Sequence, residues 1–196
     1  MEFLGPTEKA TFLERPNRFT LICRLNGKEV KAFLPNPGIL WELLLPGSEV
    51  HLQRVPPSKN RMPYTAVAIQ KEDHPVMVDT HRSNDLVEHL IQENLVPGLE
   101  GAEITKREIS HGRSRFDFLL SRGGREIILE VKFCTLFGES VAMFPDALTA
   151  RGKRHVQELA ELSKGRRTGA ILFLICWPQA KSFMPEYHTN LEFSRV

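Results

Sequence analysis

Apolar and polar residues alternate over short stretches in the first part of the chain, which is the pattern of β-strands separated by turns. A strand is predicted at residues 19–25 and its return at 29–34, because Asn26-Gly27 between them is a typical hairpin turn. The further elements expected here are one or two helical turns at 39–45 and strands at 49–55 and 65–70. About five short strands in so few residues favour a small β-barrel, for which the OB-fold is the natural candidate.

The second part of the chain has a slower rhythm, in which helices alternate with strands. Leu86, Leu90 and Ile91 form an apolar stripe on a helix predicted over 83–94, with Ser83 as its expected N-cap. The elements predicted to follow are a hairpin at 115–133, a short strand at 140–144, a helix at 146–164 and an apolar strand at 169–176. The order α-β-β-β-α-β predicts a mixed sheet with a right-handed crossover into a buried last strand.

These two rhythms predict a two-domain protein of the α+β or α/β class. The first domain is expected to be a small OB-fold-like barrel in residues 1–78, and the second a mixed α/β domain in residues 79–196. The change from one rhythm to the other places the boundary near residues 73–80.

The predicted hairpin carries charged residues in the middle of apolar strands. In the strand 115–120, Phe116 and Phe118 share one face and Asp117 lies on the other. In the returning strand, Glu130 and Lys132 lie together, opposite the apolar face. We therefore expect three charged groups to converge beside an apolar core.

Two carboxylates in such a position are costly unless a cation compensates them. Magnesium prefers oxygen ligands and keeps several waters, so Asp117 and Glu130 together with a substrate phosphate would suffice as a site. Lys132 would then orient the attacking water or neutralise developing charge. The pattern predicts a phosphodiesterase that depends on Mg²⁺ or Mn²⁺. The alternative is that Glu130 and Lys132 form an ordinary ion pair on an exposed sheet face.

Three residues on the flanking helices are further candidates. Glu88 either adds a metal-facing carboxylate or is a solvated helix residue. His155 follows Arg151 by four positions and so lies on the same helical face. Arg151 is a candidate for holding a phosphate, and His155 for exchanging protons or binding phosphate. A helical surface pair without such a role is the alternative.

The net charge of +2 says less than the distribution of the charges. Basic residues crowd around the hairpin and on the helix after it: Lys106, Arg107, Arg113, Arg115, Arg122, Arg125, Arg151, Lys153, Arg154, Lys164, Arg166 and Arg167. Such clusters near acidic candidates suit a polyanionic substrate, although a solvated charged face would also have this composition.

The barrel region offers its own candidates for binding single-stranded nucleic acid, which OB-folds hold with basic and aromatic side chains. They are Arg18, Phe19, Lys31, Lys59, Arg61 and Tyr64. For Phe19 we favour the simpler interpretation that its ring belongs to the apolar core.

Several classes of protein are disfavoured by composition. No apolar run approaches the ~20 residues of a membrane-spanning helix. The N-terminus lacks a basic segment followed by an apolar one, so no secretory signal is expected. Cys23, Cys134 and Cys176 are widely spaced in apolar surroundings. They are expected to be reduced thiols, which predicts a cytoplasmic protein.

The most specific sequence features are GRSRFDFL at residues 112–119, Glu130-Val131-Lys132, and FPDA at residues 144–147 followed by Thr149, Arg151-Gly152 and His155. With these features the chain resembles the sugar fermentation stimulation protein family, SfsA. The resemblance implies an N-terminal OB-fold followed by a PD-(D/E)XK nuclease-like domain. It also implies that Asp117, Glu130 and Lys132 are the nuclease-type triad, with Glu88, Arg151 and His155 as neighbours.

One loop departs from the family pattern. The family usually carries a Thr-Gly or similar pair after Pro35-Asn36, whereas this chain has Pro37-Gly38 followed by Ile39-Leu40.

The leading functional hypothesis is therefore a metal-dependent nuclease that hydrolyses DNA, RNA or both. The first alternative is a non-catalytic DNA-binding transcriptional regulator, which family association would connect with genes of sugar or maltose metabolism. The second is a repair or recombination accessory that recognises nucleic-acid structure. DNA is the expected partner and a membrane is not, while RNA and a second copy of the chain stay open as partners.

Overall fold

The computed structural model describes residues 4–59, 61–163 and 167–195. The chain forms two compact units that interleave along the sequence. The first unit comprises Met1–His81, Thr135–Asp146 and Ile175–Met184, and the second comprises Arg82–Cys134, Ala147–Leu174 and Pro185–Val196. The predicted domain boundary between residues 78 and 79 stays a prediction. It divides the sequence at one point, whereas each packing unit combines three separate segments. Lys164 and Arg166 of the predicted basic cluster lie outside the described residues.

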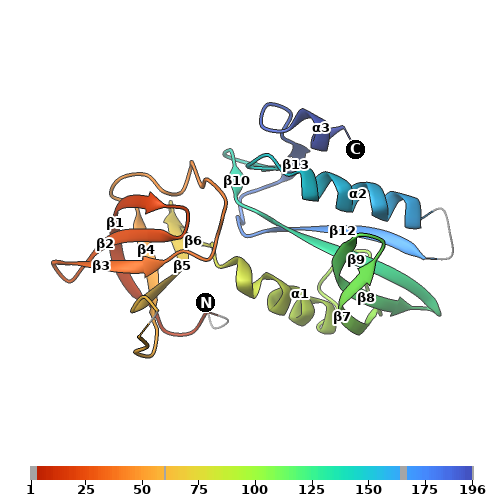
Figure 1. Ribbon diagram of the computed structural model, residues 1–196, viewed down its shortest axis with the longest axis horizontal. Coiled ribbons are helices and arrows are strands. Elements are labelled where there is room, and N and C mark those ends of the chain that lie inside the picture. Colours follow the sequence, from red (N-terminus) through yellow and green to blue (C-terminus); the bar gives the residue numbers. More distant parts are fainter. Residues whose placement is uncertain (1–3, 60, 164–166, 196) are drawn as a thin grey trace. The chain divides into compact units, whose positions relative to one another are not determined.

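Five of the six strands in this part of the first unit close into a barrel, and the sixth is appended to it (Figure 1). They are β1 (Glu8–Asn17), β2 (Thr20–Leu25), β3 (Lys28–Phe33), β4 (Glu49–Arg54), β5 (Tyr64–Lys71) and β6 (His74–Met77). The sheet order is β3-β2-β1-β4-β5-β6, and a parallel pairing of β3 with β5 closes the ring. Closure leaves β6 as a hairpin extension of β5 and gives the five-stranded OB-type barrel that the sequence predicts.

The β2–β3 hairpin shows why these residues form strands. Leu21, Cys23 and Leu25 alternate into the barrel, where their side chains are at most 6% exposed. Between the strands, Asn26 and Gly27 have φ of 50° and 78°, the left-handed pair of a tight turn. Such a turn matches the twist of the flanking strands, which is why the predicted hairpin forms.

The first unit also contains features that the sequence pattern did not predict or predicted wrongly. Strand β1 was not predicted, because it is polar and only Ala10 and Phe12 are buried in it. Of the one or two helical turns expected at 39–45, a single turn forms, in which the Leu40 carbonyl accepts the N–H groups of Leu43 and Leu44. Phe19 is 45% exposed, so the interpretation of its ring as core is wrong.

A small three-stranded sheet with the order β10-β11-β13 accompanies the barrel. Its strands are β10 (Leu136–Phe137), β11 (Val141–Phe144) and β13 (Ser182–Pro185). Strand β11 is the short strand predicted at 140–144, although it packs with the first unit rather than beside the predicted hairpin.

The second unit is a four-stranded sheet with the order β12-β9-β8-β7. Its elements are α1 (Ser83–Gln92), β7 (Glu103–His111), β8 (Ser114–Arg122), β9 (Arg125–Cys134), α2 (Ala150–Leu162), β12 (Thr168–Ile175) and α3 (Leu191–Ser194); the 3₁₀ turn η2 (Thr80–Arg82) precedes α1. Helices α1 and α2 flank the sheet (Figure 1). Leu159 of α2 packs against Ile109, Phe116 and Ile128, which joins the helix to the sheet.

Both predicted helices of this unit form, but their beginnings differ from the prediction. Ser83 is the first helical residue of α1 rather than its N-cap, and Arg82 precedes it without a side-chain cap. Helix α2 begins at Ala150 rather than 146, because the hydroxyl of Thr149 caps it by accepting the Gly152 N–H. Asp146 belongs to the first unit, where Thr135 donates a hydrogen bond to it. No helix within the described ranges is long and apolar enough to cross a membrane.

Candidate active site on the sheet of the second unit

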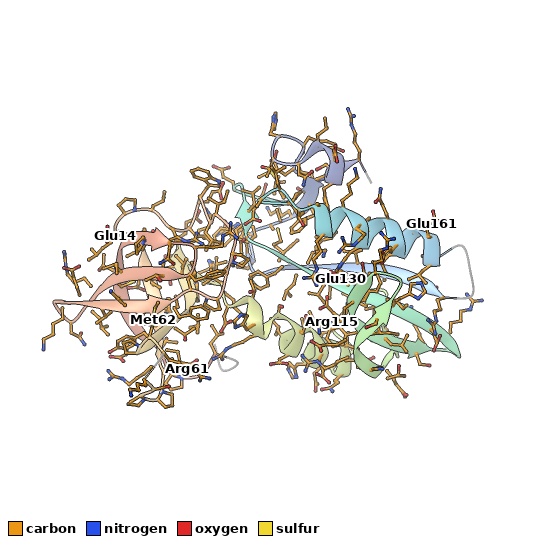
Figure 2. The ribbon with its side chains drawn as sticks, viewed as in Figure 1. Glu14, Arg61, Met62, Arg115, Glu130 and Glu161 are labelled. Atoms are coloured by element: carbon orange, nitrogen blue, oxygen red, sulfur yellow. The ribbon has the colours of Figure 1, made fainter. Side chains whose placement is uncertain are left out.

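Glu130 lies at the centre of a charged network on β9, on the side of the sheet that faces α2 (Figure 2). Its Oε1 accepts a hydrogen bond from Lys132 Nζ at 2.5 Å and another from His155 Nδ1 at 2.6 Å. The side chains of Glu130 and Lys132 are 7% and 13% exposed. The pair is therefore buried, which excludes the alternative of an ordinary ion pair on a solvated sheet face.

His155 is held from both sides of its ring. Arg151 Nε donates to His155 Nε2 at 3.3 Å, one helical turn away on α2. A carboxylate oxygen can only accept, so His155 Nδ1 is the donor to Glu130, and Nε2 accepts from Arg151. The ring is 1% exposed and lies 5.3 Å from the ring of Phe116, centroid to centroid. His155 is therefore placed to fix the orientation of Glu130.

The second carboxylate oxygen of Glu130 differs from the first in its hydrogen bonding. Oε2 is buried and has no hydrogen-bond partner among the described residues. A buried acceptor without a partner costs about 1–3 kcal/mol, and more when it is charged. An oxygen in this state is a suitable ligand for a hard divalent cation, which would provide the missing compensation.

Asp117 is attached to the same strand through a main-chain group. Its Oδ2 accepts the N–H of Val131 at 2.7 Å, directly after Glu130, and its Oδ1 accepts from Asn84 Nδ2 at 2.8 Å. Among the described residues the β8–β9 ladder runs from Arg122 paired with Arg125 to Phe118 paired with Leu129, and it stops there. The Asp117 side chain thus takes a main-chain donor where the ladder ends, one peptide from Glu130.

Asn84 is a site residue that the sequence analysis missed. It lies in the first turn of α1, one helical turn before the candidate Glu88, and this spacing is the only signal in the sequence that points to it. Its contact with Asp117 spans 33 positions, so only the tertiary structure reveals it.

Glu88 is engaged elsewhere. Its carboxylate accepts from Arg107 on β7 at 3.0 Å, and Arg107 also donates to Asp85 at 2.7 Å. The hydrogen bond that Arg107 donates to Asp85 raises the pKa of Arg107. In the described part of the chain no three His, Cys, Asp or Glu side chains form a cluster that could hold a metal. Glu88 is thus paired with Arg107, and the metal-binding roles expected of Asp117, Glu130 and Glu88 stay predictions. A site of one or two carboxylates fits a cation that keeps several waters.

Among the basic candidates of this unit, Arg151 contacts the network through its bond to His155. Arg151 and Arg113 are exposed, the latter in the β7–β8 turn, and Arg115 is exposed with Glu108 at 3.6 Å. Arg113 and Arg154 line a cavity of about 450 Å³ beside α2, where Arg154 donates to the Ser114 hydroxyl at 3.5 Å.

The barrel residues expected to bind nucleic acid are exposed, with the exception of Tyr64. Arg18, Lys31, Lys59 and Arg61 are exposed, as binding to a polyanion requires. Tyr64 is only 7% exposed, and the guanidinium of Arg54 lies 5.3 Å above its ring. The structure therefore does not support a base-stacking role for Tyr64.

Two family models together match most of the chain. The model described as the SfsA N-terminal OB domain matches residues 13–78, and the one described as the sugar fermentation stimulation protein RE domain matches residues 81–196. This chain belongs to the SfsA family. The predicted family and the predicted fold class, an OB barrel followed by a restriction-endonuclease-like α/β domain, are confirmed.

Relatives in the SfsA family extend over nearly the whole chain. A sugar fermentation stimulation protein homolog of Methanothermobacter thermautotrophicus is 40% identical over 187 residues, which cover 95% of this chain and 78% of the relative. A homolog of Moorella thermoacetica is 40% identical over 191 residues, 95% of this chain and 81% of the relative. Among solved structures, Pyrococcus furiosus SfsA in complex with Ca²⁺ matches with a TM-score of 0.89 and 29% identity, covering 97% of this chain and 82% of that one.

Proposed function

We propose that this SfsA protein is a metal-dependent nuclease that hydrolyses phosphodiester bonds at Asp117, Glu130 and Lys132. The observation that carries the proposal is that the two carboxylate oxygens of Glu130 have different surroundings. One of its oxygens is held by Lys132 and His155, while the other is buried without a partner. A carboxylate that is held in one orientation and has one buried oxygen without a partner is better explained by ligand binding than by a purely structural role.

The donor set favours Mg²⁺ or Mn²⁺, held by Glu130 Oε2 and Asp117. A relative of this chain has been solved with Ca²⁺, which supports a divalent cation of the oxygen-preferring class. When bound, such a cation stabilises negative charge on the phosphate and lowers the pKa of a water that attacks it.

The protein side chains would supply orientation and positive charge. Lys132, beside Glu130, would neutralise charge that develops on the phosphate and orient the attacking water. His155 would act as a positioning residue, since it is buried and both its ring nitrogens are bonded. The exposed guanidinium of Arg151 would bind a substrate phosphate, for which its fork of donors is suited.

Cleavage assays with matched variants test this proposal. Labelled single- and double-stranded DNA and RNA are incubated with the protein in Mg²⁺, Mn²⁺ or EDTA. We expect products only with metal, and a loss of at least about 100-fold in rate in Glu130→Gln. Glu126→Gln is the control, because Glu126 lies on the same strand but pairs with Arg167 at the surface. Cleavage that survives in Glu130→Gln, or the absence of cleavage from wild type, contradicts the proposal.

The basic side chains support nucleic acid as the substrate. Those that we assign to phosphate contacts are Arg18, Lys31, Lys59, Arg61, Arg113, Arg115 and Arg151. Because each such contact releases counterions, affinity should fall steeply as salt rises. A shallow salt dependence would exclude this assignment.

One observation favours a second function, a non-catalytic DNA-binding protein. Both oxygens of Asp117 already have donors within the chain, from Asn84 and Val131, so this carboxylate is stable without a metal. The two functions differ in one measurement. Salt-dependent DNA binding that yields no product in any metal, and that is unchanged in Glu130→Gln, would favour the second.

A further inference from the structure

A cavity of about 450 Å³ lies in the second unit, between the β7–β8 turn and the C-terminal part of α2. Glu161, labelled in Figure 2, belongs to this part of the helix. Ligand pockets commonly measure about 300–1,000 Å³, so the cavity has room for a molecule of nucleotide size. We name it the turn cavity, and the lining residues that matter for its chemistry are Gly112, Arg113, Arg154, Gln157, Glu158 and Leu162.

The carboxylate of Glu158 has an oxygen that the fold leaves without a partner. Oε2 is buried and accepts no hydrogen bond among the described residues. A buried carboxylate oxygen without a donor has lost the hydrogen bonds that water would provide, which is costly. Because Glu158 lines the turn cavity, a ligand with hydrogen-bond donors would supply the missing partner.

The neighbouring cation on the helix does not supply that partner. Arg154 precedes Glu158 by one helical turn, which is the spacing at which opposite charges usually pair. Its Nε donates instead to the Ser114 hydroxyl at 3.5 Å. Arg154 is exposed, and so is Arg113 in the β7–β8 turn. The turn cavity therefore combines an acceptor and two cations, with no ion pair between them among the described residues.

The β7–β8 turn keeps the acceptor side of the cavity open. His111 pairs with Ser114, so Gly112 and Arg113 alone form the turn. Gly112 has a φ of 58°, a left-handed conformation that a two-residue hairpin loop requires and that other residues adopt at a cost. A Cβ at this position would lie 3.5 Å from Glu158 Oε2 and 3.9 Å from Oε1. Any larger residue would thus fill the space beside the carboxylate.

A guanine nucleotide carries the groups that these side chains require. The two oxygens of a carboxylate accept hydrogen bonds in one plane. The Watson–Crick edge of guanine presents two adjacent donors in one plane, N1–H and N2–H, whereas the other bases place an acceptor beside each donor. The Gln157 amide can donate to guanine O6, and Leu162 offers an apolar wall to the ring. A phosphate suits the guanidinium groups of Arg113 and Arg154.

We propose that the turn cavity binds a guanine nucleotide, with the N1–H and N2–H donors of the base on Glu158 and the phosphate on Arg113 and Arg154. The base must be unpaired, because a G·C pair occupies the same donors. A free nucleotide and an unpaired guanine within a strand present this same chemistry. The inference deepens the proposed nuclease by naming a base that it selects, and it rests on that function only in taking a nucleotide as the ligand.

Calorimetry with mononucleotides tests the base contact. GMP, IMP and AMP are titrated into the full chain in EDTA, so that no metal contributes. We expect IMP, which lacks the N2 amino group, to bind about 10- to 100-fold more weakly than GMP, and AMP at least about 100-fold more weakly. Glu158→Gln should lose about 10- to 100-fold in GMP affinity. Its melting temperature should not fall, because the substitution removes a buried charge without a partner.

The matched control for the base contact is Glu126→Gln, which removes a carboxylate that pairs with Arg167 at the surface and should bind GMP as wild type does. The phosphate contact is tested with guanosine. Arg113→Gln should weaken GMP about 10-fold and leave guanosine unchanged. Lys106→Gln, which removes an exposed cation of β7 outside the turn cavity, should change neither affinity.

A further arm distinguishes the two sources of guanine. Labelled oligo(dT) with and without one central dG is titrated in EDTA and followed by anisotropy. Tighter binding of the strand with dG, lost in Glu158→Gln, identifies a base within a strand. GMP binding without this difference identifies the free nucleotide, and either result supports the turn cavity as a guanine site.

Four results would overturn the inference. They are equal affinities for GMP and AMP, wild-type GMP affinity in Glu158→Gln, no binding of GMP at millimolar concentration, and tighter binding of L-arginine than of GMP. The last result would assign the cavity to a guanidinium group of a peptide. Failure of the nuclease is separate: guanine selectivity without cleavage in any metal retains this inference, and cleavage without guanine selectivity removes it alone.

Discussion

Each unit of this protein contains a network built around charged side chains, but the acceptors differ: they are main-chain carbonyls in the barrel and a carboxylate in the sheet unit. In the barrel, the terminal nitrogens of Arg15 donate to four main-chain carbonyls, those of Arg18, Asn36, Gly38 and Ile39. In the sheet unit, Lys132 and His155 converge on a single oxygen of Glu130 and leave the other without a partner.

The difference separates a network that shapes the backbone from one that prepares a ligand. An arginine bonded to four carbonyls fixes the conformation of its loops, and the one donor it has left, Nε of Arg15, cannot bind a cation. A carboxylate held at one oxygen is oriented, and its other oxygen can still bind a cation. The comparison predicts that the barrel network contributes mainly to stability and the sheet network mainly to activity.

The largest expected effect is on cleavage, in Lys132→Met. Loss of the ammonium beside Glu130 removes charge stabilisation at the phosphate, and the rate should fall by about 100- to 1,000-fold. The melting temperature should fall as well, because Glu130 loses a buried partner of its charge, so the rates are compared at a temperature where both proteins are folded. The control is Lys153→Met, which removes a cation that pairs with Glu192 at the surface of α2. An unchanged rate in Lys132→Met would show that the sheet network is structural.

The barrel network is broken by Arg15→Ala. Several charge-assisted bonds to carbonyls are lost together, and the free energy of unfolding should fall by about 2–4 kcal/mol. Urea unfolding followed by the emission of the buried Trp177 measures it. Arg24→Ala, an exposed arginine of β2, should cost far less. If both variants unfold at the same urea concentration, Arg15 is not the clamp described here.

The role of His155 lies between these two cases. Removal of a group that orients a metal ligand commonly weakens metal binding about 10- to 100-fold. We expect this loss of Mn²⁺ affinity in His155→Ala, measured by calorimetry, and partial recovery in His155→Asn, whose amide can still donate to Glu130. Arg15→Ala should bind Mn²⁺ as wild type does. Unchanged Mn²⁺ affinity in His155→Ala would remove the positioning role.

The smallest expected effect is a pH dependence in the first unit. Burial raises the pKa of Asp146 above its ordinary value of 3.8. The folded state then keeps this proton at pH values where the unfolded chain has lost it, so this contribution to stability declines as pH rises above 3.8. Asp146→Asn lacks the decline, and its stability relative to wild type should increase with pH in urea titrations. Parallel stability curves would contradict this.

Much of this organisation could be predicted where a local rule applies. Alternation and the Asn26-Gly27 turn predicted the β2–β3 hairpin, and the i, i+2 spacing predicted that Glu130 and Lys132 lie together. Strand β7 was missed because its sequence, EITKREISH, is mostly polar and shows no clear alternation. The exposure of Trp41 and the burial of Tyr64 were equally hidden, because apolar residues give the same pattern in a core and at the surface.

By itself, the sequence determined the two rhythms of the chain, the barrel and sheet classes, and the charged residues on the central hairpin. These features depend on the periods of strand and helix, which act between near neighbours. Only the tertiary structure decided that Asn84 holds Asp117, that His155 binds one oxygen of Glu130, and that residues 135–146 pack with the barrel. Those contacts join distant positions, and they are set by how whole elements pack rather than by any local pattern.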